Sequence, residues 1–377
     1  MEKCPSGSEV WQVTFEKGSE SGIYNEVIYC EVPYCSSDSR YFVYGRANHA
    51  DKDNPTEFMV VELGSFRQHR LDAALGNRGC AITPDGLFYY LKRTGENTAD
   101  LMRVDLCKGS PKPSYRLENE NRAFSSGGSL GTVSPDHRWW LAGKPIEGEQ
   151  DMYGILLVDL RTGEKAVIDS DRYIFNPHPQ FNPGKPRQAM IQQNRGGHVR
   201  APGRAKRTVG PEGATLYLLS VPDGRRTPLR VGRPDTTPIT GHEAWAGKSG
   251  QIVLSVVPEG NFAVEKGNLL SIREGQPART LAGGFSFNHV GVSRCGRFFT
   301  ADDWRGTRKI VIGSVQTGRT AVLCDSRITG VAHTNLHPHA FLTPDLKWVI
   351  FNSDRSGWPH VHAASVPDSV IRELSWA

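Results

Sequence analysis

The sequence of 377 residues lacks any apolar run of about 18 residues, the length that a membrane-spanning helix requires. It also lacks a basic and apolar leader, so we expect a cytoplasmic protein, or a periplasmic or secreted one if a signal peptide has been removed. Its seven cysteines are odd in number and form no CxxC pair. This usage is typical of buried free thiols in a reducing compartment, and Cys30 and Cys35 would pair only in an exported protein.

A strong charge of one sign is also missing. The formal net charge is +5, which is modest for a chain of this length and falls well short of a nucleic-acid-binding signature. A small positive excess slightly favours an anionic ligand, either small or polymeric. We therefore expect an acidic partner, with no nucleic acid and no membrane.

Short strands and tight turns dominate what is present, since the chain carries 40 glycines and 24 prolines with 38% hydrophobic residues. A pattern of strand, Ser/Thr-Pro-Asp-Gly-like turn and apolar strand recurs seven times. Its copies are SSDSRYFVY (36–44), TPDGLFYYL (83–91), SPDHRWWLAG (134–143), NPGKPRQAMI (182–191), AGKSGQIVLSV (246–256), SRCGRFFTADD (293–303) and TPDLKWVIFNS (343–353). Most copies lie about 50 residues apart, which is a repeat length of propeller blades.

This repetition predicts an all-β fold, a seven-bladed β-propeller of four-stranded blades that forms a single domain over residues 1–377. A closed ring needs its ends joined. The early strand EVWQVTF is expected to complete the last blade beside HVHAASVP.

Histidines occupy one position of the repeat. In the last unit His339 lies six residues before the turn residue, and His337 faces the same way because alternate residues of an extended chain point to one side. His289 and His178 lie equally far before the turns of the sixth and fourth units, and His242 falls within one residue of this position in the fifth.

The innermost strand of each propeller blade begins at one mouth of the central channel, so these imidazoles are expected to converge there, with His333 beside them. Neutral imidazoles that converge indicate a divalent metal site, and they suit Mn, Fe, Ni, Cu or Zn. A single histidine at such a position is more often a hydrogen-bonded structural residue, and this alternative stays open for each of them.

A long loop in the fourth unit is rich in cations. It carries Arg195, His198, Arg200 and Arg204 among glycines. A guanidinium offers paired donors that match the two oxygens of a carboxylate, so the loop predicts a clamp for an acidic substrate, with Arg195 as its catalytic member. His178 is expected to contact the same substrate. The alternative is a solvated, flexible loop.

Several segments resemble the oligogalacturonate lyases, polysaccharide lyase family 22. The most specific are the His-Pro-His block in HPHAFLTPDLKWVIFNSDRSGWPHVHAASVPDSV and the His-Glu-x-Trp block in TGHEAW, with NHVGVSRCG, HPQFNP and DLMRVDL also similar. The resemblance spans roughly residues 25–370. It implies a seven-bladed propeller that cleaves short uronic-acid oligosaccharides by Mn²⁺-dependent β-elimination, and hence a role in pectin degradation.

The same resemblance implies residue roles. His289, His337 and His339 match the metal-binding histidines of that family, and His242 matches the histidine regarded as the base. The implied cofactor is a divalent metal, Mn²⁺ first, with Zn²⁺ or Ca²⁺ as alternatives.

Some positions differ from the family. Thr334 stands where the family has a glutamine as its fourth protein ligand, and Asn335 or His333 would supply that donor here. Thr215 stands near the family's active-site arginine, and Gln193 replaces a histidine. These differences leave open a lyase acting on another polyuronate, such as a glucuronan- or ulvan-like polymer, and a non-catalytic propeller that binds sugar or protein.

Overall fold

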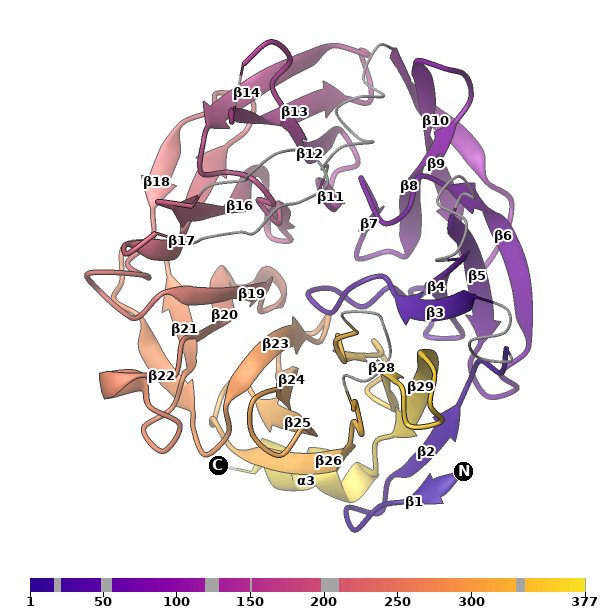
Figure 1. Cartoon of the computed structure of the whole chain (residues 1–377), viewed down its shortest axis with the longest axis vertical. Helices are drawn as coiled ribbons and strands as arrows, with labels where there is room; N and C mark the ends of the chain where they lie inside the picture. Colours follow the sequence, from indigo (N-terminus) through magenta and orange to yellow (C-terminus); the bar gives the residue numbers. More distant parts are fainter. Residues whose placement is uncertain are drawn as a thin grey trace. The chain divides into compact units, whose positions relative to one another are not determined.

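The computed structural model describes residues 1–16, 22–48, 56–118, 129–149, 151–197, 210–329 and 336–376. These residues form seven sheets, six of four strands and one of five, in which hydrogen-bonded neighbours are almost all consecutive in sequence (Figure 1). The fold is a seven-bladed β-propeller, which confirms the prediction from the repeat. The chain divides into two compact units, one of residues 1–72, 242–271 and 279–377 and one of residues 73–241 and 272–278.

The second of these units holds three complete sheets. Blade two comprises β7 (Ala81–Ile82), β8 (Leu87–Arg93), β9 (Thr98–Asp105) and β10 (Lys112–Glu118). Blade three comprises β11 (Gly131–Val133), β12 (Trp139–Pro145), β13 (Tyr153–Asp159) and β14 (Lys165–Asp171). Blade four comprises β15 (Gln180–Asn182), β16 (Lys185–Arg195), β17 (Gly213–Ser220) and β18 (Arg226–Pro228).

The other sheets belong wholly or largely to the first unit. Blade one comprises β3 (Ile23–Val27), β4 (Tyr41–Asn48), β5 (Thr56–Glu62) and β6 (Gln68–Ala74). Blade five comprises β19 (Ile239–Trp245), β20 (Gln251–Val256), β21 (Leu269–Arg273) and β22 (Arg279–Ala282), with short 3-10 turns at Gly247–Ser249 and Gly260–Phe262. Blade six comprises β23 (Phe287–Val292), β24 (Phe298–Asp303), β25 (Lys309–Ser314) and β26 (Thr320–Asp325). Blade seven comprises β27 (Phe341–Leu342), β28 (Trp348–Ser353), β29 (His360–Ser365), β2 (Glu9–Gln12) and β1 (Glu2–Lys3), and the helix α3 (Asp368–Ser375) follows it.

The N-terminal strand pairs with the C-terminal end of the chain. β2 runs antiparallel to β29, with Val10 opposite Ala364 and Gln12 opposite His362 (Figure 1). The sequence predicts this pairing for EVWQVTF. Blade seven is therefore built from both ends of the chain.

The repeated turn has a common hydrogen-bond pattern, which explains why its sequence recurs. In blade seven the hydroxyl of Thr343 donates to Asp345 Oδ1 at 2.7 Å and accepts the backbone N–H of Trp348 at 3.0 Å. Blade two repeats this with Thr83 and Asp85, whose oxygens lie 2.6 Å apart. These side chains bond backbone groups of the turn that have no hydrogen-bond partner in the sheet.

Apolar side chains from neighbouring blades pack together within each unit. In the first unit, one apolar cluster joins blades five and six and includes Phe287 and Phe299. Another joins blades six and seven and includes Phe351 of β28 and Leu374 of α3. All seven cysteines are free thiols. Among the helices in the described ranges, none combines the length and apolar character that crossing a membrane requires.

Candidate metal centre

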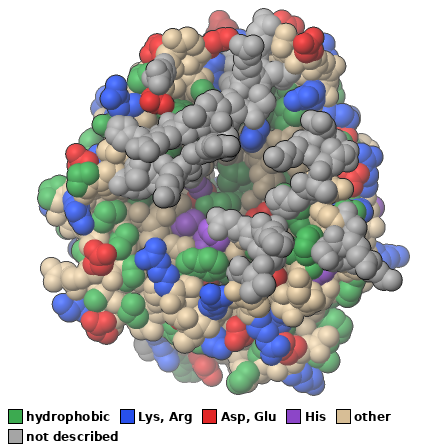
Figure 2. All heavy atoms as spheres, viewed as in Figure 1, with side chains coloured by type: hydrophobic (Ala, Val, Ile, Leu, Met, Phe, Trp, Pro, Cys, Tyr) green, Lys and Arg blue, Asp and Glu red, His purple; other side chains and the backbone are tan. Residues whose placement is uncertain are grey.

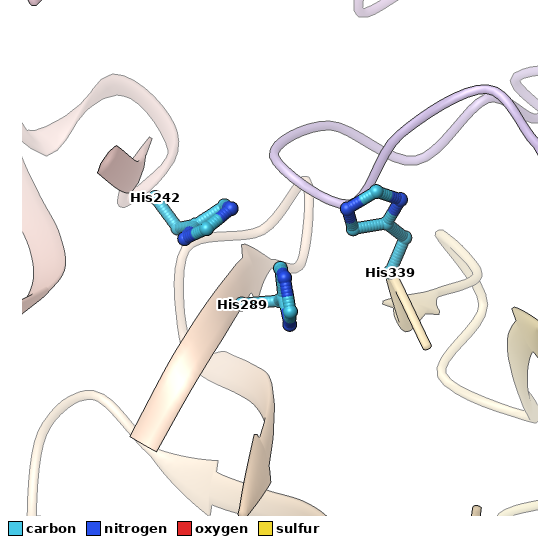
Figure 3. A group of neighbouring side chains, drawn as sticks. All are labelled: His242, His289 and His339. Carbon is cyan, nitrogen blue, oxygen red and sulfur yellow. The ribbon is translucent and has the colours of Figure 1, made fainter. Parts of the chain in front are cut away.

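Three histidines of the first unit meet at one point. His242 lies on β19, His289 lies on β23, and His339 lies just before β27. Each offers a ring nitrogen, and these atoms all lie within 4.8 Å of one another (Figure 3). Three blades therefore each contribute one imidazole to a single cluster, as the shared repeat position predicts.

The rings differ in burial. His289 and His339 are only 1% and 9% exposed, whereas His242 is partly exposed. The His242 ring lies 4.2 Å from the His289 ring, between centroids, and 6.4 Å from the His339 ring. On the face drawn in Figure 2, histidine side chains reach the surface beside hydrophobic ones. His242 is thus the member of the cluster most able to meet a ligand from solvent.

Asp302 on β24 orients His289. One carboxylate oxygen lies 2.6 Å from His289 Nδ1, and the other accepts the backbone N–H of His289 at 2.9 Å. Asp302 is 1% exposed. An acceptor on Nδ1 fixes the proton there and leaves the lone pair on Nε2, which is the arrangement that supports metal-bound histidines in proteins.

His337 packs against His289 from the other side. Its Nδ1 lies 2.9 Å from His289 Nε2, close enough for a hydrogen bond. Burial, and secondarily the neighbouring His289, lower the pKa of His337 to about 4. The imidazole is therefore neutral at neutral pH, and a neutral imidazole can donate a lone pair to a metal.

The turn that carries His337 and His339 is held by Asn352 of β28. Asn352 donates its backbone N–H to the carbonyl of Pro338 at 2.8 Å and its side-chain amide to the carbonyl of His337 at 3.0 Å. His339 has a φ of +43°, a left-handed conformation that is uncommon outside glycine. The hydrogen bonds of Asn352 hold this conformation in place.

Three further side chains border the cluster, and the sequence pattern did not indicate them. A carboxylate oxygen of Glu26 lies 3.9 Å from His339 Nδ1, and burial raises the pKa of Glu26 to about 7. Between ring centroids, Tyr29 lies 4.5 Å from His339 and Trp304 lies 4.7 Å from His337. Glu26 and Tyr29 come from blade one, which carries no histidine at the repeat position.

Among the substrate-binding residues predicted in blade four, His178 lies in the described part of the second unit. His178 is 7% exposed, and its Nε2 lies 2.6 Å from the side-chain amide of Asn176. Like His339 it has a φ of +43°, and its preceding Pro177 accepts the backbone N–H of Gln192 at 2.7 Å. The Asn-Pro-His turn of blade four therefore matches the His-Pro-His turn of blade seven at its proline and its final histidine, but differs at its first residue, since Asn176 has a φ of +54° and His337 is not left-handed.

Arg195 ends β16, and its guanidinium donates to the backbone carbonyl of Arg233 at 2.8 Å. Its Nε has no hydrogen-bond partner among the described residues. The other predicted site residues lie outside those residues, namely His198, Arg200, Arg204, His333 and Asn335.

The donor set fits a divalent cation. Three ring nitrogens lie within 4.8 Å of one another, so they are near enough to share one ion, and Asp302 presets the tautomer of one of them. Imidazole ligands suit Mn, Fe, Ni, Cu and Zn more than Ca, which prefers oxygen. The arrangement can therefore hold a transition-metal ion.

Comparison with known proteins identifies the fold. No protein-family model matches the chain, and no curated protein matches its sequence significantly. Among solved structures, an oligogalacturonate lyase in complex with manganese is similar over 98% of this chain and 96% of its own, with a TM-score of 0.69 and 18% identity. An oligogalacturonate lyase from Vibrio parahaemolyticus is similar over 98% and 97%, with a TM-score of 0.65 and 16% identity.

Other propellers are similar as well. The hydrazine synthase of Kuenenia stuttgartiensis matches 89% of this chain and 95% of its own, with a TM-score of 0.52 and 14% identity. The fold shared with oligogalacturonate lyases thus confirms the resemblance at the level of architecture. Because one fold hosts several chemistries, the function has to be argued from the site.

Proposed function

We propose that the protein is a metal-dependent lyase that cleaves uronic-acid-containing, oligogalacturonate-like oligosaccharides by β-elimination. The observation that carries this proposal is the convergence of His242, His289 and His339, with their nitrogens within 4.8 Å, on a fold that oligogalacturonate lyases share. The proposed cofactor is a divalent metal ion, Mn²⁺ in the first place.

Of the three-nitrogen group, His289 and His339 are the proposed metal ligands and His242 is kept as the base. His337, which lies outside that group but has its Nδ1 2.9 Å from His289 Nε2, is proposed as the third ligand. The chemistry that a bound cation supplies is stabilisation of the negative charge that grows on the uronate carboxylate as the neighbouring C5 proton leaves. Asp302 contributes by holding the His289 ring in one orientation.

His242 is the proposed base. His242 is the least buried residue of the three, and its ring lies 4.2 Å from that of the buried His289 between centroids. In the reaction His242 takes the C5 proton, the electrons of that bond form the C4–C5 double bond, and the C4–O bond breaks with its electron pair on the oxygen, which takes a proton from water. A neutral imidazole can accept a proton in such a transfer.

Cationic side chains are proposed to bind the other carboxylates of the substrate. Arg195 is the first candidate, since a guanidinium offers paired donors that match the two oxygens of a carboxylate. His178, His198, Arg200 and Arg204 are proposed as further contacts to the acidic oligosaccharide.

Two local contacts favour an altered substrate within the same reaction class. The hydroxyl of Thr215, near the position of the family's arginine, is buried and donates to the carbonyl of Val231. The amide of Gln193 donates to Asp171 at 2.8 Å. Thr215 cannot supply the positive charge of an arginine, and Gln193 cannot supply the imidazole of a histidine. A lyase on another polyuronate is therefore the second candidate.

A substrate panel tests the proposal. Wild-type protein, His242→Ala and His337→Ala are incubated with Mn²⁺ and oligomers of galacturonate, glucuronate and ulvan, and the unsaturated uronate product is followed by its ultraviolet absorbance. We expect product from wild type on at least one polymer, loss after chelation, and a decrease of at least about 100-fold for His242→Ala.

The matched control is His69→Ala, which removes an exposed histidine of β6. It should behave as wild type. A wild-type protein that holds metal but gives no product on any polyuronate would exclude the lyase and leave a sugar-binding propeller.

A further inference from the structure

Trp304 lies beside the histidine cluster, and the mechanism above does not use it. The residue follows β24 directly and is partly exposed. Its ring centroid lies 4.7 Å from that of His337, with the planes inclined by 58°, and 5.6 Å from that of His289, with the planes inclined by 81°. An indole therefore meets both solvent and the cluster.

The hairpin that carries Trp304 is strongly fixed. The buried carboxylate of Asp303 accepts the backbone N–H of Thr307 at 2.6 Å, the hydroxyl of Thr307 at 2.8 Å and the backbone N–H of Ser286 at 2.8 Å. Gly306 passes so close that a β-carbon there would lie 2.3 Å from an Asp303 oxygen. These contacts set the position of the indole before any ligand arrives.

Strand geometry explains why the indole reaches the cluster. Side chains two residues apart on a strand point to the same face. Asp302 points to His289, with an oxygen 2.6 Å from its Nδ1, and the ring of Trp304, the residue after the strand, lies 5.6 Å from the same imidazole between centroids, which shows that it continues on that side.

The surroundings indicate which ligand the indole suits. Binding sites for small molecules combine flat apolar surface with a few polar groups that fix orientation. Here the indole supplies the surface, and the histidines supply the polar groups. Exposed Arg308 has its guanidinium carbon 6.0 Å from the Trp304 ring centroid, which favours an anionic ligand. An acidic sugar suits this combination. The apolar C–H face of its pyranose ring matches the indole, and its polar edges and carboxylate match the histidines and the arginine.

We propose that Trp304 is the stacking platform of this site, on which the pyranose ring of an acidic oligosaccharide lies while its carboxylate faces the histidine cluster. This inference rests on the proposed function and adds the residue that positions the sugar ring. It assigns Trp304 to substrate binding and leaves metal binding to the histidines.

Variants of Trp304 test the platform. Trp304→Leu and Trp304→Phe are made in the His242→Ala background, which prevents turnover, and binding of trigalacturonate in the presence of Mn²⁺ is measured by calorimetry. We expect the dissociation constant to rise about tenfold for Leu, which loses the aromatic face, and less than about threefold for Phe, which keeps one. Affinity for Mn²⁺ without sugar should stay within about twofold.

The matched control is Trp376→Leu, which removes an indole that is 69% exposed near the end of the chain. Its sugar affinity should not change. Equal sugar affinity of Trp304→Leu and its parent would overturn the platform and leave the lyase proposal standing. Absence of both binding and cleavage by the wild-type protein across the polyuronate panel would overturn the lyase proposal itself.

A second measurement uses the unaltered protein, so it does not depend on the variants folding. Indole oxidation by N-bromosuccinimide is quantified for each tryptophan by peptide mass spectrometry, with and without trigalacturonate. We expect the sugar to protect Trp304 and not Trp376. Oxidation of Trp304 at the same rate in both samples, under conditions where the sugar binds, would contradict the proposal.

Discussion

At the scale of single residues, the contact between Asp302 and His289 determines how well the cluster can hold a metal. The carboxylate is buried, and both of its oxygens contact His289, one through the ring and one through the backbone. A carboxylate in this position fixes the tautomer and increases the basicity of the other ring nitrogen. The tautomer is therefore set by a residue that need not touch the metal.

We predict that Asp302→Asn weakens Mn²⁺ binding by about 10- to 100-fold, because the amide keeps the size of the carboxylate and loses its charge. Calorimetric titration with Mn²⁺ measures this directly, without a substrate. Asp85→Asn, in an exposed turn beside His137, serves as the control. Unchanged metal affinity for Asp302→Asn would show that the pairing with His289 is structural only.

His362 of β29 is a buried histidine outside the cluster. It is 1% exposed, its ring lies 5.7 Å from that of Phe351 between centroids, and its Nε2 has no hydrogen-bond partner among the described residues. Burial is the main cause that lowers the pKa of His362 to about 3. The unfolded chain therefore binds a proton near pH 6.5 that the folded protein does not accept until the pH approaches 3.

The sign of the effect follows from this difference. As pH falls below about 6.5 the unfolded state is protonated first, so the free energy of unfolding decreases, by about 2 kcal/mol between pH 8 and pH 5 from this residue. We predict that His362→Phe reduces this loss. Urea denaturation of both proteins at pH 8 and pH 5 measures it, and an equal loss in wild type and variant would contradict the assignment.

At the scale of elements, the turn before β27 depends on one asparagine of the neighbouring strand. Asn352 is fully buried and holds the carbonyls of His337 and Pro338, while its side-chain oxygen accepts the backbone N–H of Val27 at 2.8 Å. It thus joins the histidine turn of blade seven to the end of β3 in blade one.

We predict that Asn352→Ala lowers the free energy of unfolding by about 2–4 kcal/mol, because two side-chain hydrogen bonds are lost and buried backbone groups are left without partners. Metal affinity should fall as well, since the turn that places His337 and His339 is loosened. Chemical denaturation and Mn²⁺ titration measure the two effects. Asn268→Ala, at a buried asparagine of blade five that also bonds backbone groups, is the control that should lower stability and retain metal affinity.

The elements also show how far the sequence could predict the site. The turn residues Thr343 and Asp345 recur in other repeats, so the blades and the positions of His289 and His339 could be inferred from register. Asp302, Tyr29 and Glu26 could not, because nothing in their spacing marks them and their contacts with the histidines arise from packing of separate strands. Trp304 could have been marked only by its position two residues after Asp302, at the end of a repeated strand. That position becomes informative only when the fold shows that Asp302 faces His289.

At the scale of the whole molecule, the two ends of the chain share a sheet. Val10 of β2 is 3% exposed and belongs to the apolar cluster that also contains Leu374 of α3. Ser8 donates to the carbonyl of Ser365, and the Ser365 hydroxyl accepts the backbone N–H of Glu9. Without these residues the edge of β29 would lie open to pairing with another chain.

We predict that deletion of residues 1–12 lowers the melting temperature by more than about 5 °C and promotes aggregation, because it uncovers both a strand edge and part of the apolar cluster. Thermal denaturation and size-exclusion chromatography measure these effects. Lys3→Ala, which removes a side chain that is 75% exposed, is the control. A truncated protein that melts as wild type would show that β2 contributes little to the fold.

The turn shared by blades four and seven has a consequence for how such a site can change. In both turns the final histidine has a φ of +43° and the proline carbonyl accepts a backbone N–H from the second strand of its blade, so the main chain of these two positions is kept while the first residue varies. A blade is then an interchangeable part, and its ligands can be gained or lost one substitution at a time. Asn176→His would give blade four a second histidine, on a left-handed residue (φ of +54°) that has no counterpart at His337, so a second metal site built into this repeat would have a geometry of its own.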